Sequence, residues 1–396
     1  MSKIIVHIDL NAFFATCEQI KHPEFVGKPV IVAGLGGRGV VSTASYEARS
    51  YGVHSAMPTY QARELCPQGI FVEGDYQYYE MMSRSFFSYI RSFTSLVEEA
   101  SIDECFADMS KALAKEKDPY AFFKRVQDGL YSQMGLKCSI GVAPNKFLAK
   151  MGSDMKKPMG ITIVRKKDIP FLIYPLPIES FFGIGKRTSP KLREMGINTI
   201  GDLAEKLKVD DPSLQETLGK FYFTVKDWCF GNGSDVIDTL PFDPKSIGHS
   251  ITFPSDTDDY EEIKQEISLL SHEVSDGANQ CHKKGRTVQL AVKDSSFHTH
   301  DKSISFKDLT SDYSVIFQKA TDLFEHNFLG MTIRLVGVTL QNLVDPKEET
   351  VQMSFWNFGD YEKMDETKLL VNELNRKMKT PSLKLANEVK KKNGSK

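Results

Sequence analysis

The sequence predicts an α+β protein built from several domains. With 396 residues, 41% of them apolar, the chain can bury more than one core, and its length suggests two to four domains. In the first 170 or so residues, runs of branched apolar residues typical of strands alternate with longer amphipathic stretches typical of helices. Residues 245–341 then follow the pattern strand, helix, strand, strand, helix, strand, which is the split βαβ plan.

The N-terminal part supplies most of the expected elements. Lys3 to Asp9 is a run of branched residues ending in an acid, which indicates a buried strand. Further strands are expected at 29–33, 40–43, 96–101, 105–109 and 137–142. Helices are expected at 11–19, around Tyr46, and at 57–65, 76–93 and 120–134. The strands at 96–101 and 105–109 flank Ile102-Asp103-Glu104, so we expect a β-hairpin with acids at its turn.

The composition changes along the second half of the chain. From about Pro170, prolines and glycines punctuate a series of short helices that continues to about Gly233. Gly231 to Pro244 is rich in breaking residues and is interpreted as a linker. The last 50 or so residues are polar, with one apolar island at Met353 to Phe358.

Bulk composition excludes several classes of protein. A formal net charge of −2 means that any contact with nucleic acid must come from local patches. The six cysteines are scattered without a C-x-x-C pair, which argues against a zinc site or a disulfide framework and fits a reducing cytosol. The N-terminus does not resemble a signal peptide, and no apolar run approaches the roughly 20 residues that span a bilayer. We therefore expect a cytoplasmic protein without membrane contact.

Three carboxylates are the first candidate constellation. Asp9 ends a buried strand, and Asp103 and Glu104 sit at a hairpin turn about 95 residues later. If both elements belong to one sheet, the three acids converge, and such close like charges call for a cation. Oxygen ligands suit Mg²⁺, and two such ions can support phosphoryl transfer. The alternative is that Asp9 caps a helix and the acidic pair is a solvated turn.

A second constellation suits a nucleoside triphosphate. Tyr46 and Arg49, within Thr43 to Arg49, share one helical face, and arginine binds phosphate in bidentate fashion. Lys157 could add positive charge, although all three could be ordinary surface residues.

Phe13 and Phe14 follow the first strand. One is expected in the core, and the other could lie beneath the sugar of a nucleotide, where its ring would clash with a 2′-hydroxyl; both could instead be core residues.

Three further motifs each allow a functional and a structural interpretation. Gly34 to Gly39 matches G-x-G-x-x-G, but it leads into a strand, so we interpret it as a hairpin and not as a dinucleotide site. The pattern of Phe182 to Ala204 predicts two helices joined by a Gly-Ile-Gly turn. Such a turn can hold a DNA backbone, here through Gly183, Gly185 and Lys186, or it can be a plain helical turn. Gln352 to Trp356 (QMSFW) suits docking into a pocket on another protein, or packing on its own domain.

Taken together, these motifs resemble the Y-family, or DinB/UmuC-type, translesion DNA polymerases. The resemblance rests on residues 5–14, on STASYEAR, on Ser101 to Glu104, on NKFLAK with KKPMG, and on GIGKRTSPKL, and it covers about residues 1–345. It implies a right-hand polymerase with a ferredoxin-like palm, small fingers, a helical thumb and a split-βαβ little finger. The implied ranges are 1–10 and 75–168 for the palm, 11–74 for the fingers, 169–235 for the thumb, 236–244 for a linker, 245–345 for the little finger and 346–396 for a polar tail.

The resemblance also implies residue roles. The metal-binding carboxylates would be Asp9, Asp103 and Glu104, with the Leu10 carbonyl as a backbone ligand for two Mg²⁺ ions, which Mn²⁺ could replace. Phe14 would be the steric gate. The other implied dNTP contacts are Phe13, Arg38, Ser42, Thr43, Tyr46, Arg49 and Lys157. Contacts to DNA are expected from Gly183, Gly185, Lys186, Lys283, Lys284 and Arg286. A sliding clamp of the β-subunit type would be bound by Gln352, Met353, Ser354, Phe355 and Trp356.

The expected function is therefore low-fidelity translesion synthesis without proofreading, by a monomer acting on primer-template DNA in the bacterial cytoplasm, at the nucleoid. Some departures from the family pattern are visible. Asn11 stands where many members have Asp, and Phe355-Trp356 replaces the usual Leu-Phe. Residues 241–345 hold ten Lys and Arg against sixteen Asp and Glu, a net charge of −6, so DNA binding there is expected to be weak and salt-sensitive.

Two rival functions remain at this stage. A nucleotide cyclase-like palm uses similar paired acids but needs no DNA-binding hairpin. A catalytically silent factor that binds DNA or a clamp would need neither the three carboxylates nor the triphosphate residues. His7 lies on the same strand face as Asp9 and receives no role from the sequence.

Overall fold

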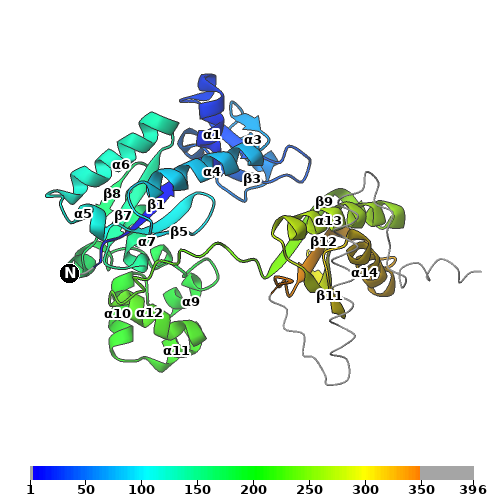
Figure 1. The fold of residues 1–396 in the computed structure, drawn as a ribbon. Helices are drawn as coiled ribbons and strands as arrows, with labels where there is room; N and C mark the ends of the chain where they lie inside the picture. Colours follow the sequence, from blue (N-terminus) through cyan, green and yellow to red (C-terminus); the bar gives the residue numbers. More distant parts are fainter. Residues whose placement is uncertain (1–2, 348–396) are drawn as a thin grey trace, which may run out of the picture. The chain divides into compact units, whose positions relative to one another are not determined.

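The computed structural model describes residues 3–347, and they form two compact units that divide after Asp243 (Figure 1). Each unit is an α+β structure with its own sheet or sheets. Among residues 3–347, no helix is both long enough and apolar enough to cross a bilayer.

A five-stranded sheet forms the centre of the first unit. Its strands run in the order β5 (Val97–Glu99), β6 (Glu104–Asp108), β1 (Ile5–Leu10), β7 (Cys138–Ala143) and β8 (Ile161–Ile163). The central strand β1 pairs antiparallel with both β6 and β7. All six of its side chains are buried, which explains its unbroken run of branched residues.

The two faces of β1 belong to different cores. Val6, Ile8 and Leu10 join the core that includes helices α4 (Tyr76–Arg91) and α6 (Pro119–Met134). Ile5 instead joins the core that contains helix α7 (Lys146–Asp154), because alternate residues of a strand point to opposite faces. His7 and Asp9 share the face of Ile5, so the strand directs its two polar residues toward α7.

A small three-stranded sheet follows the first strand in sequence. Its order is β3 (Val41–Ala44), β2 (Val30–Ala33) and β4 (Ile70–Val72), and it packs with helices α1 (Phe13–Lys21), α2 (Tyr46–Arg49) and α3 (Thr59–Leu65). The glycine-rich loop Gly34 to Gly39 joins β2 to the antiparallel β3. A Cβ on Gly39 would lie 1.8 Å from the Gly34 carbonyl oxygen, so the tight turn requires glycine. The loop therefore leads into a strand, as expected, and no helix starts there.

A helical region completes the first unit. Its helices are α8 (Ile169–Leu172), α9 (Ser189–Glu194), α10 (Ile200–Lys208), α11 (Pro212–Leu218) and α12 (Tyr222–Cys229). They share one apolar core with α7. The expected helix before the Gly-Ile-Gly turn is only a 3-10 turn, at Ile178–Ser180, because Pro175 and Pro177 interrupt the preceding stretch.

The segment after α12 is tied to the sheet. The Lys146 backbone N–H donates to the Ser234 carbonyl at 2.9 Å, and the Asp238 N–H donates to Glu98 Oε2 at 2.8 Å. Lys146 Nζ is 2.9 Å from the same Glu98 oxygen. The first part of the expected linker is therefore held along the five-stranded sheet and α7 by directional hydrogen bonds.

The second unit has the order of elements that the sequence predicts. Its elements are β9 (Ser246–Thr257), α13 (Tyr260–Gln280), β10 (Gly285–Asp294), β11 (Thr299–Thr310), α14 (Tyr313–Asn327) and β12 (Ile333–Gln341). The four strands lie in the order β11, β10, β12, β9. Asp259 and Asp312 cap the two helices by accepting backbone N–H bonds, which fixes where each helix begins.

Candidate active site

Two of the predicted carboxylates face each other across neighbouring strands. Asp9 in β1 pairs in register with Glu104, the first residue of β6. Directly opposed residues project from the same face of a sheet, so both side chains point toward α7. Glu104 therefore belongs to the strand itself, while Asp103 remains in the turn that precedes it.

Two lysines neutralise this pair. Lys157 Nζ lies 2.6 Å from Asp9 Oδ2, and Lys150 Nζ lies 2.6 Å from Glu104 Oε1 and 3.4 Å from Asp9 Oδ2. Asp154 Oδ1 also contacts Lys157, at 2.8 Å. The Lys150 side chain is 13% exposed and that of Asp9 is 8% exposed, so solvent ions screen these contacts less than surface ion pairs.

Burial sets the proton affinity of the carboxylate pair. Burial raises the pKa of Asp9 to about 7, and the adjacent Glu104 adds to the rise while Lys157 opposes it. Burial acts in the same direction on Glu104, but hydrogen bonds from His7, Asp9 and Lys150 outweigh it and hold the pKa of Glu104 well below its usual range. Around neutral pH, Asp9 therefore gains and loses a proton, while Glu104 stays ionised and accepts a hydrogen bond from the protonated Asp9.

The third carboxylate lies beside the pair but is turned away from it. Asp103 Oδ1 accepts a hydrogen bond from Ser101 Oγ at 2.6 Å, and the Asp103 backbone carbonyl accepts one from the Leu10 N–H at 3.0 Å. Within the described part of the chain, no three His, Cys, Asp or Glu side chains are grouped closely enough to hold a metal as they stand.

The donor set nevertheless fits a divalent cation. Asp9, Asp103, Glu104 and the Leu10 carbonyl line one cavity and would present only oxygen, which Mg²⁺ prefers. A cation there would also displace the proton that Asp9 binds.

The cavity above the carboxylates has a volume of about 390 Å³ and extends to the small sheet. Its walls include most residues that the sequence assigns to a nucleotide: Asp9, Leu10, Phe13, Phe14, Ser42, Thr43, Tyr46, Arg49, Asp103, Glu104 and Lys157. Arg38, in the glycine-rich loop, does not line it. The fold thus gathers residues from β1, α1, β3, α2 and the turn before β6 around one space.

Tyr46 and Arg49 form one wall of this cavity. Ser45 caps the short helix α2 by accepting the Ala48 N–H, which fixes the helix start. The Arg49 guanidinium carbon lies 4.8 Å from the centre of the Tyr46 ring, and Arg49 Nε donates to the Ala44 carbonyl at 2.9 Å. These contacts orient a planar cation toward the space above Asp9.

Both phenylalanines of α1 line the cavity, but they differ in burial. Phe13 is 2% exposed and packs in the main core, while Phe14 is partly buried. The Phe14 ring stacks on Tyr79, with centroids 4.5 Å apart and planes at 13°. Tyr76 meets the Phe14 ring edge-on and lies 3.4 Å from Ser42 Oγ through its hydroxyl.

The predicted DNA-contacting residues lie outside this cavity. Gly183 has φ +91°, and a Cβ there would lie 2.7 Å from the Phe221 ring, whereas a Cβ on Gly185 would meet nothing within 4 Å. Ile184 between them is buried and anchors the turn, and Lys186 is exposed. The turn thus has the shape that only glycine allows at its first position.

The predicted basic residues of the second unit lie near the end of α13 and the start of β10. Lys283 and Lys284 line a cavity of about 410 Å³, together with Lys347. The Lys284 backbone pairs with Val344, and Arg286 lies within β10. The predicted clamp-binding residues, Gln352 to Trp356, lie outside the described residues.

Several residues of the site were not assigned a role from the sequence. Lys150 bridges both carboxylates, and fully buried His7 places Nδ1 2.7 Å from Ser153 Oγ and Nε2 3.6 Å from Glu104. Burial lowers the pKa of His7. Asn11 accepts the Met159 N–H at 2.8 Å, which holds the loop that carries Lys157. The sequence contains one signal for Lys150. It is a charged residue whose neighbours in the helix are almost all apolar or small, which indicates a lysine that faces the interior of the protein.

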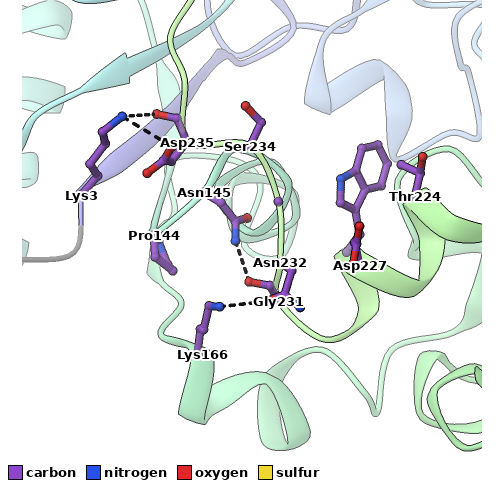
Figure 2. A pocket seen from close by; sticks show the side chains of 12 residues that line it. Lys3, Pro144, Asn145, Lys166, Thr224, Asp227, Gly231, Asn232, Ser234 and Asp235 are labelled. Atoms are coloured by element: carbon purple, nitrogen blue, oxygen red, sulfur yellow. Dashed lines mark hydrogen bonds and ion pairs between the residues drawn. The ribbon is translucent and has the colours of Figure 1, made fainter. Parts of the chain in front are cut away.

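A larger cavity, of about 670 Å³, lies at the junction of the sheet with the helical region (Figure 2). Asn145 Nδ2 donates to the Gly231 carbonyl at 2.9 Å, Lys166 Nζ to Asn232 Oδ1 at 3.0 Å, and Lys3 Nζ to the Asp235 carbonyl at 3.0 Å (Figure 2). The side chains of Asn145, Lys166 and Lys3 thus hold residues 231–235 in place, and the predicted catalytic carboxylates do not line this cavity.

Comparisons with known proteins agree with this geometry. The impB/mucB/samB family matches residues 8–154, and its C-terminal domain matches residues 244–355. The chain is 36% identical to DNA polymerase IV of Clostridium kluyveri over 406 residues, covering 99% of both chains. It is also 36% identical to DNA polymerase IV of Oceanobacillus iheyensis, covering 95% of this chain and 89% of that one.

Solved structures give the same result. A Y-family DNA polymerase chimera of Dbh and Dpo4 superposes with a TM-score of 0.76 at 26% identity, covering 86% of this chain and 99% of the other. An insertion ternary complex of Dbh DNA polymerase gives a TM-score of 0.61 at 25% identity with the same coverage.

Proposed function

The chain belongs to the impB/mucB/samB family and is a DNA-directed DNA polymerase of the Y family, and we propose that it performs low-fidelity translesion synthesis. In this reaction the primer 3′-hydroxyl attacks the α-phosphate of a dNTP that pairs with the template, and pyrophosphate leaves. The observation that carries the proposal is the single cavity lined by the predicted carboxylates, by the predicted triphosphate residues and by Phe14.

Y-family polymerases generally depend on divalent metal, and we propose that two Mg²⁺ ions bind to Asp9, Asp103, Glu104 and the Leu10 carbonyl. When bound, Mg²⁺ lowers the pKa of the attacking hydroxyl and stabilises the charge that develops on the phosphates. The residues of this chain hold and orient the reactants. Asp9 and Glu104 are fixed by their strand register, so both carboxylates are aimed before substrate arrives.

The triphosphate is assigned to Tyr46, Arg49 and Lys157. Lys157 contacts Asp9 at 2.6 Å, close enough for its ammonium to exchange that carboxylate for a phosphate oxygen. Arg49 offers a planar guanidinium oriented by the Tyr46 ring. The Phe14 ring forms the floor where the sugar would lie, which supports its role as the gate against ribonucleotides.

Low fidelity and the absence of proofreading are also part of the proposal. The cavity wall on the side of β3 consists of Ser42 and Thr43, which are small and leave room for a distorted base pair.

Primer-template DNA is assigned to the Gly183 turn with Lys186, and to Lys283, Lys284 and Arg286 in the second unit. A sliding clamp is assigned to residues 352–356, and the site of action to the bacterial chromosome in the cytoplasm.

Primer extension tests the proposal. The protein is supplied with a labelled primer-template, dNTPs and Mg²⁺, and wild type is compared with Asp103→Ala and with the control Glu99→Gln, an exposed acid on the same sheet that pairs with Arg91. We expect extension by wild type and by the control, and a loss of at least about a thousandfold in the variant, because a metal ligand would be lost. Equal extension by wild type and Asp103→Ala would refute the assignment of the metal site.

Fidelity is tested on the same DNA. A template with an abasic site should be bypassed, and a mismatched primer should not be shortened. Degradation of the mismatched primer by the pure protein would refute the absence of proofreading. If a folded wild-type protein failed to extend any primer, the remaining function would be that of a silent DNA- or clamp-binding factor.

A further inference from the structure

A buried carboxylate near the nucleotide cavity has no role in the proposed chemistry. Glu18 lies on α1, one helical turn after Phe14, and is only 3% exposed. It does not line the cavity. Burying a carboxylate carries a large desolvation penalty, so a position of this kind calls for a compensating contact.

That contact is made with Tyr79 of α4. The Tyr79 hydroxyl donates to Glu18 Oε1 at 2.6 Å, and Tyr79 is completely buried. Hydrogen bonds to a carboxylate are shorter and stronger than those between neutral groups. The bond therefore fixes the Tyr79 ring in both position and rotation.

The Tyr79 ring in turn sets the position of the Phe14 ring. The two rings are nearly parallel, at 13°, with centroids 4.5 Å apart. Stacked rings resist separation but slide easily over each other, since stacking alone contributes only about 1 kcal/mol. A ring that must block a 2′-hydroxyl needs its edge placed to within about 0.5 Å, as any preorganised binding group does.

We propose that Glu18 is a positioning residue for sugar selection: through Tyr79 it fixes the Phe14 ring in the place where it excludes ribonucleotides. The contacts begin and end on the same helix. Glu18 and Phe14 are four residues apart on α1, so both side chains face α4 and contact Tyr79. The inference rests on the proposed role of Phe14 as the gate.

The test measures the efficiency of single-nucleotide insertion, kcat/KM, with a ribonucleotide and with the matching deoxyribonucleotide. Glu18→Gln keeps an oxygen acceptor for the Tyr79 hydroxyl and should preserve the wild-type ratio within about twofold. Glu18→Met and Tyr79→Phe should each raise the ratio of ribonucleotide to deoxyribonucleotide insertion about three- to tenfold, which is the size of the net contribution of one typical hydrogen bond.

The double variant Glu18→Met/Tyr79→Phe separates positioning from stability. It leaves neither partner buried without a hydrogen bond, so its thermal unfolding should be closer to wild type than that of Tyr79→Phe. Its insertion ratio should nevertheless stay raised, and by no more than in the single variants, because both act through one contact. A wild-type ratio in both Glu18→Met and the double variant would overturn the inference.

Phe14→Ala shows which proposal has failed if the ratio does not change. If Phe14→Ala raises ribonucleotide insertion strongly while Glu18→Met does not, Phe14 is the gate and Glu18 does not position it. If Phe14→Ala leaves the ratio unchanged, the assignment of the gate fails, and the role of Glu18 fails with it.

Discussion

Replacing Asp9 by Asn should stabilise the protein in the absence of divalent metal. Burial beside Glu104 raises the pKa of Asp9 to about 7, against about 3.9 in an unfolded chain. Between these values the folded protein binds a proton that the unfolded chain does not, so the free energy of unfolding falls as pH rises from about 4 to 7 and stays low above 7. The difference between the two pKa values of Asp9 lowers the free energy of unfolding of the wild type by about 4 kcal/mol at pH 8. This value is an upper bound on the stability that Asp9→Asn gains, because Lys157 loses its charged partner in the variant.

Thermal unfolding in EDTA at several pH values measures this effect. At pH 8 we expect Asp9→Asn to unfold with a Tm about 2–10 °C above wild type, since 1 kcal/mol shifts the Tm of a unit this size by about 2–4 °C. Near pH 4, where wild-type Asp9 keeps its proton, the two should nearly coincide. Millimolar Mg²⁺ should raise the Tm of wild type at pH 8 and leave that of the variant unchanged.

Asp154→Asn is the matched control. Asp154 also pairs with Lys157, but its side chain is 48% exposed. The Tm of Asp154→Asn should not exceed that of wild type, and the difference between the two Tm values should stay constant between pH 4 and 7. The reasoning would be refuted if Asp9→Asn were less stable than wild type at pH 8 in EDTA, because the ion pair with Lys157 would then outweigh burial and repulsion.

Three further predictions follow from other contacts. Lys150→Met should tighten binding of Mn²⁺, measured by titration calorimetry, about fivefold, because a competing cation at the carboxylate pair is removed; unchanged or weaker binding would contradict this. Gly183→Ala should weaken binding to a primer-template duplex about tenfold, measured by fluorescence anisotropy, because residue 183 has φ +91° and the Phe221 ring would lie 2.7 Å from the new Cβ. The control Gly185→Ala has open space around its new Cβ and should bind the duplex like wild type. Glu98→Ala should speed trypsin cleavage after Lys245, because the segment that precedes Lys245 loses its hydrogen bond to strand β5. An unchanged cleavage rate would show that this bond does not restrain the segment.

The sequence was sufficient for those parts of the site that depend on local pattern. The run from Lys3 to Asp9 predicted a buried strand with an acid at its end, and β1 is that strand. The hairpin strands around Asp103 and Glu104, and the short helix around Tyr46, also follow from local pattern, as the structure confirms. The order of elements in residues 245–341 was likewise predicted, because each element there has a clear period of its own.

The rest depends on packing between distant segments. Lys150 reaches Asp9 across 141 positions in sequence, and only the docking of α7 on the face of β1 brings them together. The same docking gives His7 its contact with Ser153, 146 positions away. The orientation of Asp103 toward Ser101 is a choice of side-chain rotamer, which the pattern of residue types does not encode.

Helix α7 connects the five-stranded sheet and the helical region within the first unit. One face of its N-terminal turn holds residues 231–238, through Asn145 and Lys146, while Lys150 and Ser153, one and two turns later, contact the carboxylates and His7. Its apolar side chains belong to the core of the helical region. A short, almost fully buried helix with polar residues at both ends thus links the carboxylate pair at Asp9 and Glu104 to the segment after α12. Because a rigid element transmits displacement without absorbing it, changes at Asn145 should alter insertion kinetics as well as the hold on residues 231–235.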